Sequence, residues 1–104
     1  MQLSYLDLSF ANLRGCDFSH CTAIDIKIQN ANLQNCIFSD SNLKQASFRE
    51  SNLCKSVFDR ANISNGDFSK VIAKDCTFIK TKLINADMRE GDFENSSFNE
   101  ANMY

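Results

Sequence analysis

The residues with the most chemical potential in this chain are its cysteines, four of which recur at related spacings. Cys16, Cys21, Cys36 and Cys76 could ligate a metal, because structural zinc takes four Cys or His ligands that converge on one point. Cys16 and Cys36 are the pair whose spacing could make them neighbours, yet no third and fourth ligand joins them. We therefore interpret these residues as buried free thiols that act as small hydrophobic side chains, and we predict no metal and no cofactor.

His20 is the single histidine, and Asp17 and Asp40 are expected on the same side of the molecule. A general base needs a nucleophile within hydrogen-bond reach and a pocket that excludes water. The many serines form no Gly-x-Ser-x-Gly elbow, and the sequence has no phosphate loop and no dinucleotide fingerprint. We predict that His20 is an exposed surface residue and that the protein is not an enzyme.

The pattern that must position all these residues has a period of five. Every fifth residue from Leu3 to Met103 is apolar, without a change of phase. This period fits neither the 3.6 residues of a helix turn nor the 2.0 of a strand. Two residues before each large residue, from Ala11 onward, nearly every unit has a small one. Such a unit cannot bury its own apolar face, so successive turns must stack as a solenoid.

A second period, of 20 residues, sets the number of units in one turn of the solenoid. Phenylalanine recurs at this spacing from Phe18 to Phe98 without exception. Twenty residues are four units, which predicts a four-sided coil, with coils about 4.8 Å apart and like residues stacked in columns. The predicted core contains the large residues Leu13, Phe18, Leu33, Phe38, Leu43, Phe48, Leu53, Phe58, Ile63, Phe68, Phe78, Leu83, Phe93 and Phe98.

Written as A(D/N)LXX, the unit resembles the repeat of pentapeptide-repeat proteins, as in Ala31-Asn32-Leu33, Ala61-Asn62-Ile63 and Ala86-Asp87-Met88. The resemblance covers essentially the whole chain. It implies an all-β fold, a right-handed quadrilateral β-helix, here of about five coils of 20 residues. Because the phase is unbroken, with no proline and only three glycines, we expect one domain over residues 1–104.

The composition also bears on the cellular compartment of the protein. No run approaches the roughly 20 apolar residues of a membrane span, and no segment resembles a signal peptide. Leu3 is already in phase, so we expect no removable leader. Cys54 falls at an outward position, where a secreted protein would risk stray disulfides. We therefore predict a cytoplasmic protein that does not enter a membrane.

The outward residues predict a surface for a protein partner. The side that bears the phenylalanine column carries acidic and apolar residues, and residues 85–104 carry five acids against Arg89 alone. The candidate partner residues are Asp17, Ile37, Asp40, Val57, Asp59, Ile79, Asp87, Glu90, Asp92 and Glu94. The net charge is −2, without a continuous basic stripe, so we predict no direct binding of nucleic acid.

These observations predict a non-catalytic protein-binding or scaffold module. The alternative is an interaction with DNA gyrase or topoisomerase IV that confers quinolone resistance by target protection, because two stretches, 16–28 and 67–76, are similar to the quinolone-resistance group. A net charge of −2 opposes mimicry of DNA, since 25 Å of duplex carries about 15 negative charges. A third hypothesis is a stripped-down repeat without a partner. Neither coil end shows a cap, so we also expect a homodimer through these ends, a side-to-side dimer, or excision of the chain from a longer one.

Overall fold

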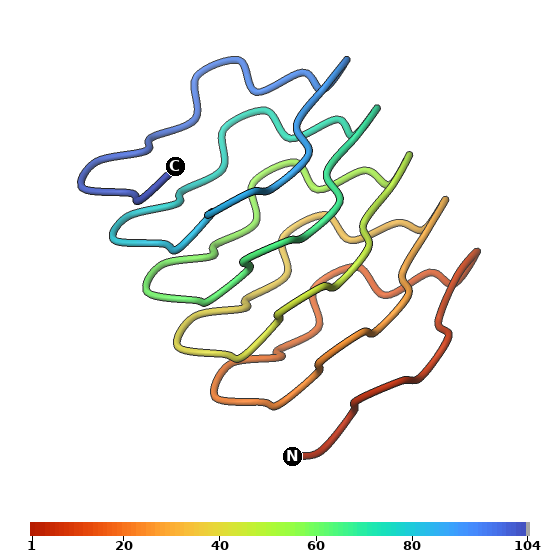
Figure 1. Cartoon of the computed structure of the whole chain (residues 1–104). Coiled ribbons are helices and arrows are strands. Elements are labelled where there is room, and N and C mark those ends of the chain that lie inside the picture. Colours follow the sequence, from red (N-terminus) through yellow and green to blue (C-terminus); the bar gives the residue numbers. More distant parts are fainter. Residues whose placement is uncertain (104) are drawn as a thin grey trace.

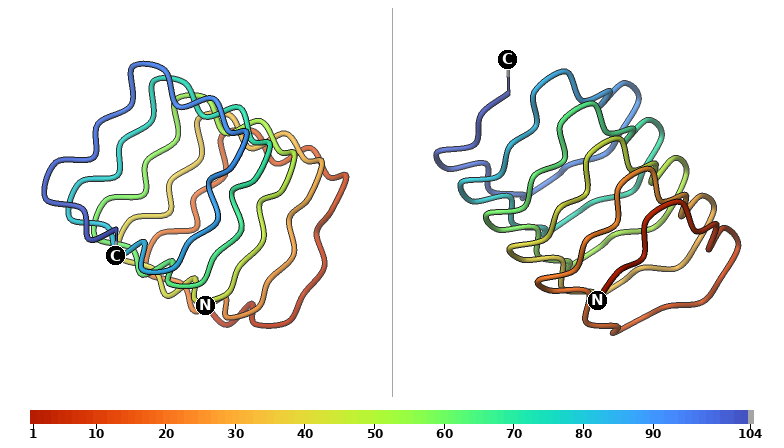
Figure 2. Two further views of the ribbon diagram at one scale, coloured as in Figure 1. Left: turned by 45° about the horizontal axis from the view of Figure 1, so that its top comes forward. Right: turned by 60° about the horizontal axis from the view of Figure 1, so that its bottom comes forward.

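In the computed structural model, which describes residues 1–103, the chain winds as a stack of coils with its two ends at opposite ends of the stack (Figure 1). The stack measures 28 × 21 × 21 Å. Single parallel bridges join the coils, and every bridge pairs two residues that are 20 positions apart, from Gln2–Thr22 to Lys82–Asn102. Two further views show the coils stacked one on the next along the whole length (Figure 2). The predicted 20-residue period is therefore confirmed.

Residues 1–103 contain no helix, and each stretch of β-structure is a single bridge residue rather than a continuous strand. The five-residue repeat explains why continuous strands do not form. Every fifth residue from Tyr5 to Glu100 has a positive φ, between 53° and 76°. One positive φ at the third residue of a four-residue turn is typical of a type II turn. A corner at each unit leaves one bridge residue between corners, too few for a continuous strand.

Bridge residues define four sides of the coil, and we number these sides by their order in the chain. The first side carries bridge residues 2, 22, 42, 62, 82 and 102, and the second carries 7, 27, 47, 67 and 87. The third side carries 12, 32, 52, 72 and 92, and the fourth carries 17, 37, 57, 77 and 97.

Backbone hydrogen bonds connect each coil to both neighbours. On the fourth side, the Phe38 N–H donates to the Val57 carbonyl at 2.7 Å, toward the following coil. The Ile37 N–H donates to the Cys16 carbonyl at 3.0 Å, toward the preceding coil. The same pattern recurs on the other sides, so the coils are hydrogen-bonded as in a parallel sheet.

The interior is filled by two aromatic columns that meet edge to face. Rings 18, 38, 58, 78 and 98 stack with centroids 4.7–5.0 Å apart and planes within 8° of parallel. Phe48 and Phe68 stack at 5.2 Å in a neighbouring column. Their rings cross the first column at 79–83°. Of the predicted core residues, Leu13, Phe93 and Phe98 in the terminal coils are half-buried, and the other eleven are buried.

Toward the C-terminal end, the sizes of the residues at the large and small inward positions compensate each other. Ala73 and Val71 are both buried, as their swapped sizes predict. In the next coil Gly91 occupies the small position, and a Cβ there would lie 2.5 Å from Cε2 of Phe93. The ring of Phe93 therefore uses the space that a side chain at residue 91 would need.

Some serines at the small inward position of the repeat hydrogen-bond to the turn of the preceding coil. The buried Ser56 hydroxyl donates to the Leu33 carbonyl at 2.6 Å and accepts from the Cys36 N–H at 3.1 Å. Those two groups are the ones that would otherwise bond to each other across the corner. Ser51 and Ser96 occupy equivalent positions with the same two bonds. A small polar residue thus serves two coils at once.

Candidate partner-binding surface

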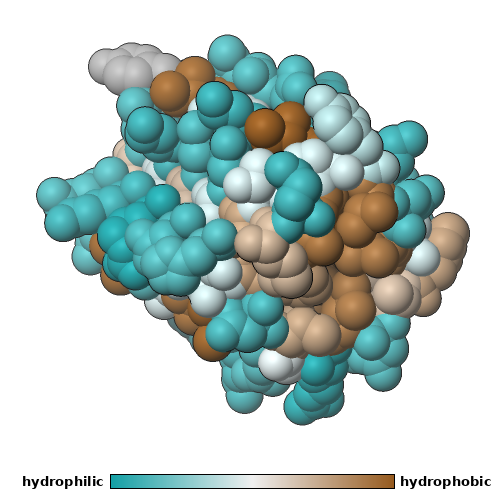
Figure 3. Space-filling model, turned by 90° about the horizontal axis from the view of Figure 1, so that it is seen from below, coloured by the Kyte–Doolittle hydropathy of each residue, from teal (hydrophilic) through white to brown (hydrophobic). Residues whose placement is uncertain are grey.

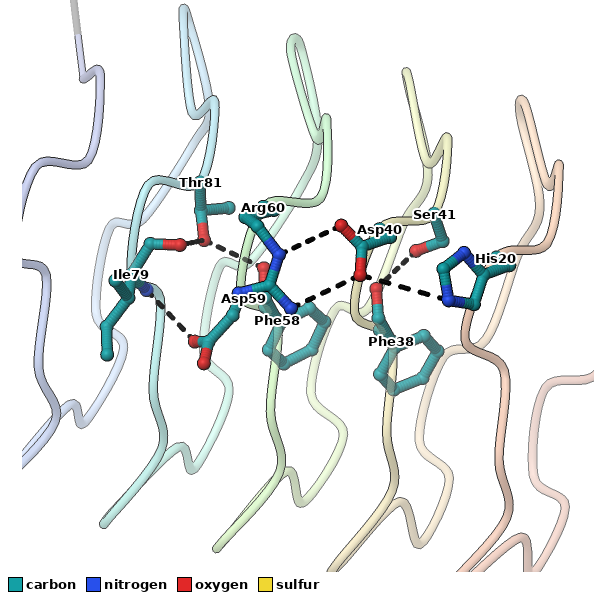
Figure 4. A network of polar contacts seen from close by, with 9 residues as sticks. All are labelled: His20, Phe38, Asp40, Ser41, Phe58, Asp59, Arg60, Ile79 and Thr81. Carbon is teal, nitrogen blue, oxygen red and sulfur yellow. Dashed lines mark hydrogen bonds and ion pairs between the residues drawn. The ribbon is translucent and has the colours of Figure 1, made fainter.

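The fourth side gathers six of the candidate partner residues on one surface. Ile37 pairs with Asp17 in the preceding coil and with Val57 in the following coil. Ile37 is 41% exposed, whereas Val57 is half-buried. Asp40 stands at the corner beside this column, and Asp59 and Ile79 lie in the same corner region (Figure 4). The result is an apolar strip with carboxylates on its flanks.

A row of charged side chains lines the corner of this side. Arg60 holds Asp40 with two hydrogen bonds, Nε to Oδ1 at 2.9 Å and Nη2 to Oδ2 at 3.2 Å. The His20 Nε2 lies 3.9 Å from the Asp40 Oδ2 on the other side (Figure 4). The hydrogen bonds from Arg60 lower the pKa of Asp40. A bidentate pair of this kind fixes both side chains in one orientation.

Two other carboxylates of the fourth side are committed to the backbone. Asp59 Oδ1 accepts the N–H of Ile79, one coil onward, at 3.0 Å. Asp17 Oδ1 accepts the N–H of Ser19 at 2.9 Å and its hydroxyl at 2.6 Å, and these bonds lower the pKa of Asp17. These acids therefore shape the corner as well as charging the surface.

The acidic residues near the C-terminal end lie on other sides. Asp87 is a bridge residue of the second side and Asp92 of the third. Asp92 lies 3.6 Å from the Lys74 ammonium and accepts the Glu94 N–H at 3.2 Å. Glu90 and Glu94 are exposed. The candidate residues thus form two separate surfaces, an apolar-acidic one on the fourth side and an acidic one around the last coil.

The Asp87–Arg89 pair yields a pH prediction. Arg89 Nη2 donates to Asp87 Oδ2 at 2.8 Å and Nε donates to Oδ1 at 3.0 Å. This pairing lowers the pKa of Asp87 from 3.8 to about 2. Because the folded-state pKa is the lower one, the pair stabilises the fold above pH 3.8 and loses that contribution as the pH falls toward 2. An NMR titration should give a midpoint near 2 for Asp87, and Arg89→Gln should move it toward 3.8. An unchanged midpoint in Arg89→Gln would contradict the pairing.

The repeated Asn and Asp at the bridge positions satisfy the turn amides. Asn32 Oδ1 accepts the N–H of Gln34 at 3.1 Å, and Asn52 Oδ1 accepts the N–H of Cys54 at 3.1 Å. Asn12, Asn42 and Asn62 do the same two residues onward. This is the Asx-turn geometry that asparagine favours. These side chains serve the fold, which explains why Asn and Asp recur at the bridge position.

The residues considered for chemistry do not converge in the described part of the chain. Cys21, Cys36 and Cys76 are buried and Cys16 and Cys54 are half-buried, all as free thiols. Burial raises the pKa of Cys76 to about 11. Within residues 1–103, no three His, Cys, Asp or Glu side chains are grouped as a metal ion would require. His20 is three-quarters exposed. In the same residues, no helix is long and apolar enough to span a membrane.

The sequence analysis did not predict the hydrogen bonds from serines at the small inward position to the preceding coil. Ser51, Ser56 and Ser96 read as small residues in the repeat, and their two hydrogen bonds to the preceding coil were not predicted. The available signal was the choice of serine where alanine also fits. A buried hydroxyl requires partners, and the open backbone groups of a corner are the nearest ones.

Comparison with known proteins shows which family the chain resembles. The family description "Pentapeptide repeat region" matches residues 11–83, and "Pentapeptide repeats (8 copies)" matches residues 74–104. No curated protein matches the sequence. A pentapeptide repeat protein from the thylakoid lumen of Arabidopsis thaliana superposes with a TM-score of 0.83 at 26% identity. The match covers 86% of this chain and 62% of the Arabidopsis protein.

A second solved structure has the same fold at lower similarity. QnrB1 (R167E, trypsin-treated), a plasmid-mediated fluoroquinolone resistance protein, matches with a TM-score of 0.50 at 14% identity, over 96% of this chain and 72% of that one. These relatives imply a right-handed β-helix. The coil with a corner at every fifth residue, the 20-residue bridges and the family matches agree, and the chain belongs to the pentapeptide repeat family.

Proposed function

We propose that this protein is a non-catalytic binding or scaffold module, a single rod of about five coils over residues 1–104 that recognises another protein through the fourth side. Tyr104 lies outside the described residues. The observation that carries the proposal is the apolar strip at Ile37, which is 41% exposed on a side whose flanking carboxylates are already held by the chain. A surface with its side chains fixed before binding loses little conformational entropy on association.

The chemistry of the strip defines its partner. Ile37 and Val57 offer apolar contact and Asp17 adds a carboxylate in the preceding coil, whereas the charge of Asp40 is compensated by Arg60. A complementary protein surface has an apolar residue at its centre and lysine or arginine around it. The exposed Glu90 and Glu94 extend the negative field on the other sides of the last coil, where Asp87 and Asp92 are paired with Arg89 and Lys74. Electrostatic attraction of this type speeds association and falls with added salt.

A photo-crosslinking amino acid at Val57 tests this proposal in cells. We expect a defined covalent adduct with one protein, and about a tenfold lower yield when Ile37 is changed to Glu, since removing a central apolar contact costs on the order of 1–2 kcal/mol. Lys27→Glu is the matched control, because Lys27 holds the same bridge position in the same coil on the second side. Mass spectrometry identifies the adduct. Equal adduct yield in the Ile37→Glu and wild-type proteins would contradict a binding role for the fourth side.

The second candidate function is protection of DNA gyrase or topoisomerase IV from quinolones. The fold shared with QnrB1 supports it, without assigning its partner to this chain. In a gyrase supercoiling assay with a fluoroquinolone, a protecting protein raises the drug concentration needed for inhibition. Absence of an effect at micromolar protein, with and without drug, removes this candidate and leaves the fourth-side proposal in place.

We further propose a reducing compartment, the cytoplasm, as the place of action. All five cysteines are free thiols, and the half-buried Cys54 would be open to pairing in an oxidising compartment. The proposal involves neither direct nucleic-acid binding nor a membrane, in keeping with the acidic composition.

A further inference from the structure

The fourth side carries apolar and charged residues at positions that a two-fold axis would exchange. Ile37 and Val57 are bridge residues of consecutive coils, and the corner residues of the same two coils are Asp40 and Arg60. Consider a two-fold axis that crosses this side midway between the two coils, perpendicular to the rod. It brings Ile37 of one copy opposite Val57 of another, and Asp40 of one copy opposite Arg60 of the other. Each contact occurs twice, as in any isologous interface.

We propose that the fourth side binds the fourth side of a second copy of this chain, in an antiparallel pair centred between residues 37 and 57. The inference rests on the proposed binding role of the fourth side and names its partner. A complementary surface has an apolar centre with lysine or arginine around it, and the fourth side itself has Arg60 and Lys80 at its corner. Arg60 binds Asp40 through Nε and Nη2, so its Nη1 donors remain for the second copy.

Other registers bring like charges together. Moving the axis by half a coil in one direction would place Asp40 opposite Asp40. Moving it in the other direction would place Asp59 opposite Asp59 and Arg60 opposite Arg60. A parallel pair would oppose the two Asp17 carboxylates, because each coil would face its own counterpart. In the antiparallel register, Asp17 would instead face Thr77. Since like charges in contact disfavour an interface, the charges on this side select one arrangement.

The other charged residues of the fourth side are compatible with this arrangement. Asp59 of one copy would face Ser39 of the other, a carboxylate opposite a hydroxyl group. His20 would face Lys80, a pair that is unfavourable only while His20 is protonated. The arrangement therefore gains two Asp40–Arg60 contacts between copies without bringing two carboxylates together.

The size of the overlap sets the expected affinity. The rows of residues 17, 37, 57 and 77 overlap in this register. Rows about 4.8 Å apart, across a width of 21 Å, give roughly 400 Å² per copy. A standard interface buries about 800 Å² per partner, and smaller interfaces are weak. We therefore expect half-association at high micromolar to millimolar protein. Sedimentation velocity of the purified chain, up to about 1 mM, should show a mass that rises with concentration and stops at two copies.

A charge exchange tests the contact between copies. Asp40→Arg and Arg60→Asp should each raise the dissociation constant about 3- to 10-fold, because each places like charges opposite one another. An equimolar mixture of the two variants should return to within about twofold of the wild type, since two arginines of one chain then face two aspartates of the other. The ion pair within one chain cannot explain such a recovery, because each chain in the mixture still lacks that pair.

Ile37→Glu tests the apolar centre and should raise the dissociation constant more than about tenfold. Ile72→Glu is the matched control, because Ile72 is a bridge residue of the third side and is 46% exposed, against 41% for Ile37. Phe10→Glu is a second control for apolar contacts elsewhere. Phe10 is 79% exposed, and apolar side chains also gather on the face seen from below (Figure 3). Neither control substitution should change the association, and circular dichroism shows that each variant keeps its fold.

Four results overturn the proposal. They are a wild-type protein that stays monomeric at every concentration, a mass that rises past two copies, charge variants that do not recover when mixed, and association that Phe10→Glu or Ile72→Glu weakens as much as Ile37→Glu does.

The photo-crosslinking experiment at Val57 separates this inference from the proposed function. An adduct of twice the chain mass that depends on Ile37 supports both. An adduct with a different protein that depends on Ile37, together with a monomeric purified chain, overturns the second copy as the partner and leaves the binding role of the fourth side in place. An adduct yield that Ile37→Glu leaves unchanged contradicts the binding role itself.

Discussion

Replacing Phe58 by alanine is expected to lower the free energy of unfolding by about 3–5 kcal/mol, the usual cost of emptying an aromatic site in a core. The ring is fully buried and stacks on Phe38 at 4.8 Å and on Phe78 at 4.9 Å. It also meets the edges of Phe48 and Phe68. Neighbouring rings are held by hydrogen-bonded coils, so the cavity cannot collapse easily. Urea denaturation followed by far-UV circular dichroism measures the loss.

Phe98→Ala is the control for the position of the ring along the rod. Phe98 stacks on Phe78 at 4.7 Å but is half-buried in the last coil. Because a solenoid gains its stability from contacts between neighbouring repeats, an end residue with one stacking partner should cost about 1–2 kcal/mol. Equal losses at residues 58 and 98 would contradict a rod stabilised by stacked columns.

Ser56→Val is expected to cost about 1–3 kcal/mol, the penalty for leaving buried polar groups without partners. The valine side chain is larger than serine by one carbon, and it cannot donate to the Leu33 carbonyl or accept from the Cys36 N–H. Ser56 is fully buried, so water cannot replace the hydroxyl. Thermal and urea unfolding measure the change.

Ser56→Cys is the matched variant, because cysteine already occupies this column at residues 36 and 76. Cys36 Sγ donates to the Leu13 carbonyl at 3.0 Å, and Cys76 Sγ donates to the Leu53 carbonyl at 2.9 Å. In those two turns the backbone closes the corner itself, at 3.1 Å in both. We expect the cysteine variant to lose less than half of what valine loses. A valine variant as stable as the wild type would show that the corner satisfies its own groups.

The candidate surface was only partly predictable. The 20-residue spacing places Asp17, Ile37 and Val57 on one side, and the bridges pair them. The sequence does not show that Asp17 and Asp59 are hydrogen-bonded to backbone amides, because these bonds depend on rotamers at the corner. It also does not show that Asp40 is held by Arg60 one coil onward. Charges counted as free in the sequence are therefore partly engaged in the structure.

The sequence by itself determined the period of five, the 20-residue repeat and the identity of the core columns, because every coil imposes the same spacing on the next. A single unit would give a weak signal, but repetition over the whole chain leaves one phase that buries every large residue. The tertiary structure alone decided how polar groups are paired. Ser56 reaches the corner of the preceding coil, and Arg60 reaches Asp40, across 20 or more residues of chain. Such choices depend on which hydrogen-bonding groups the neighbouring coil leaves open, and the repeat pattern does not specify these partners.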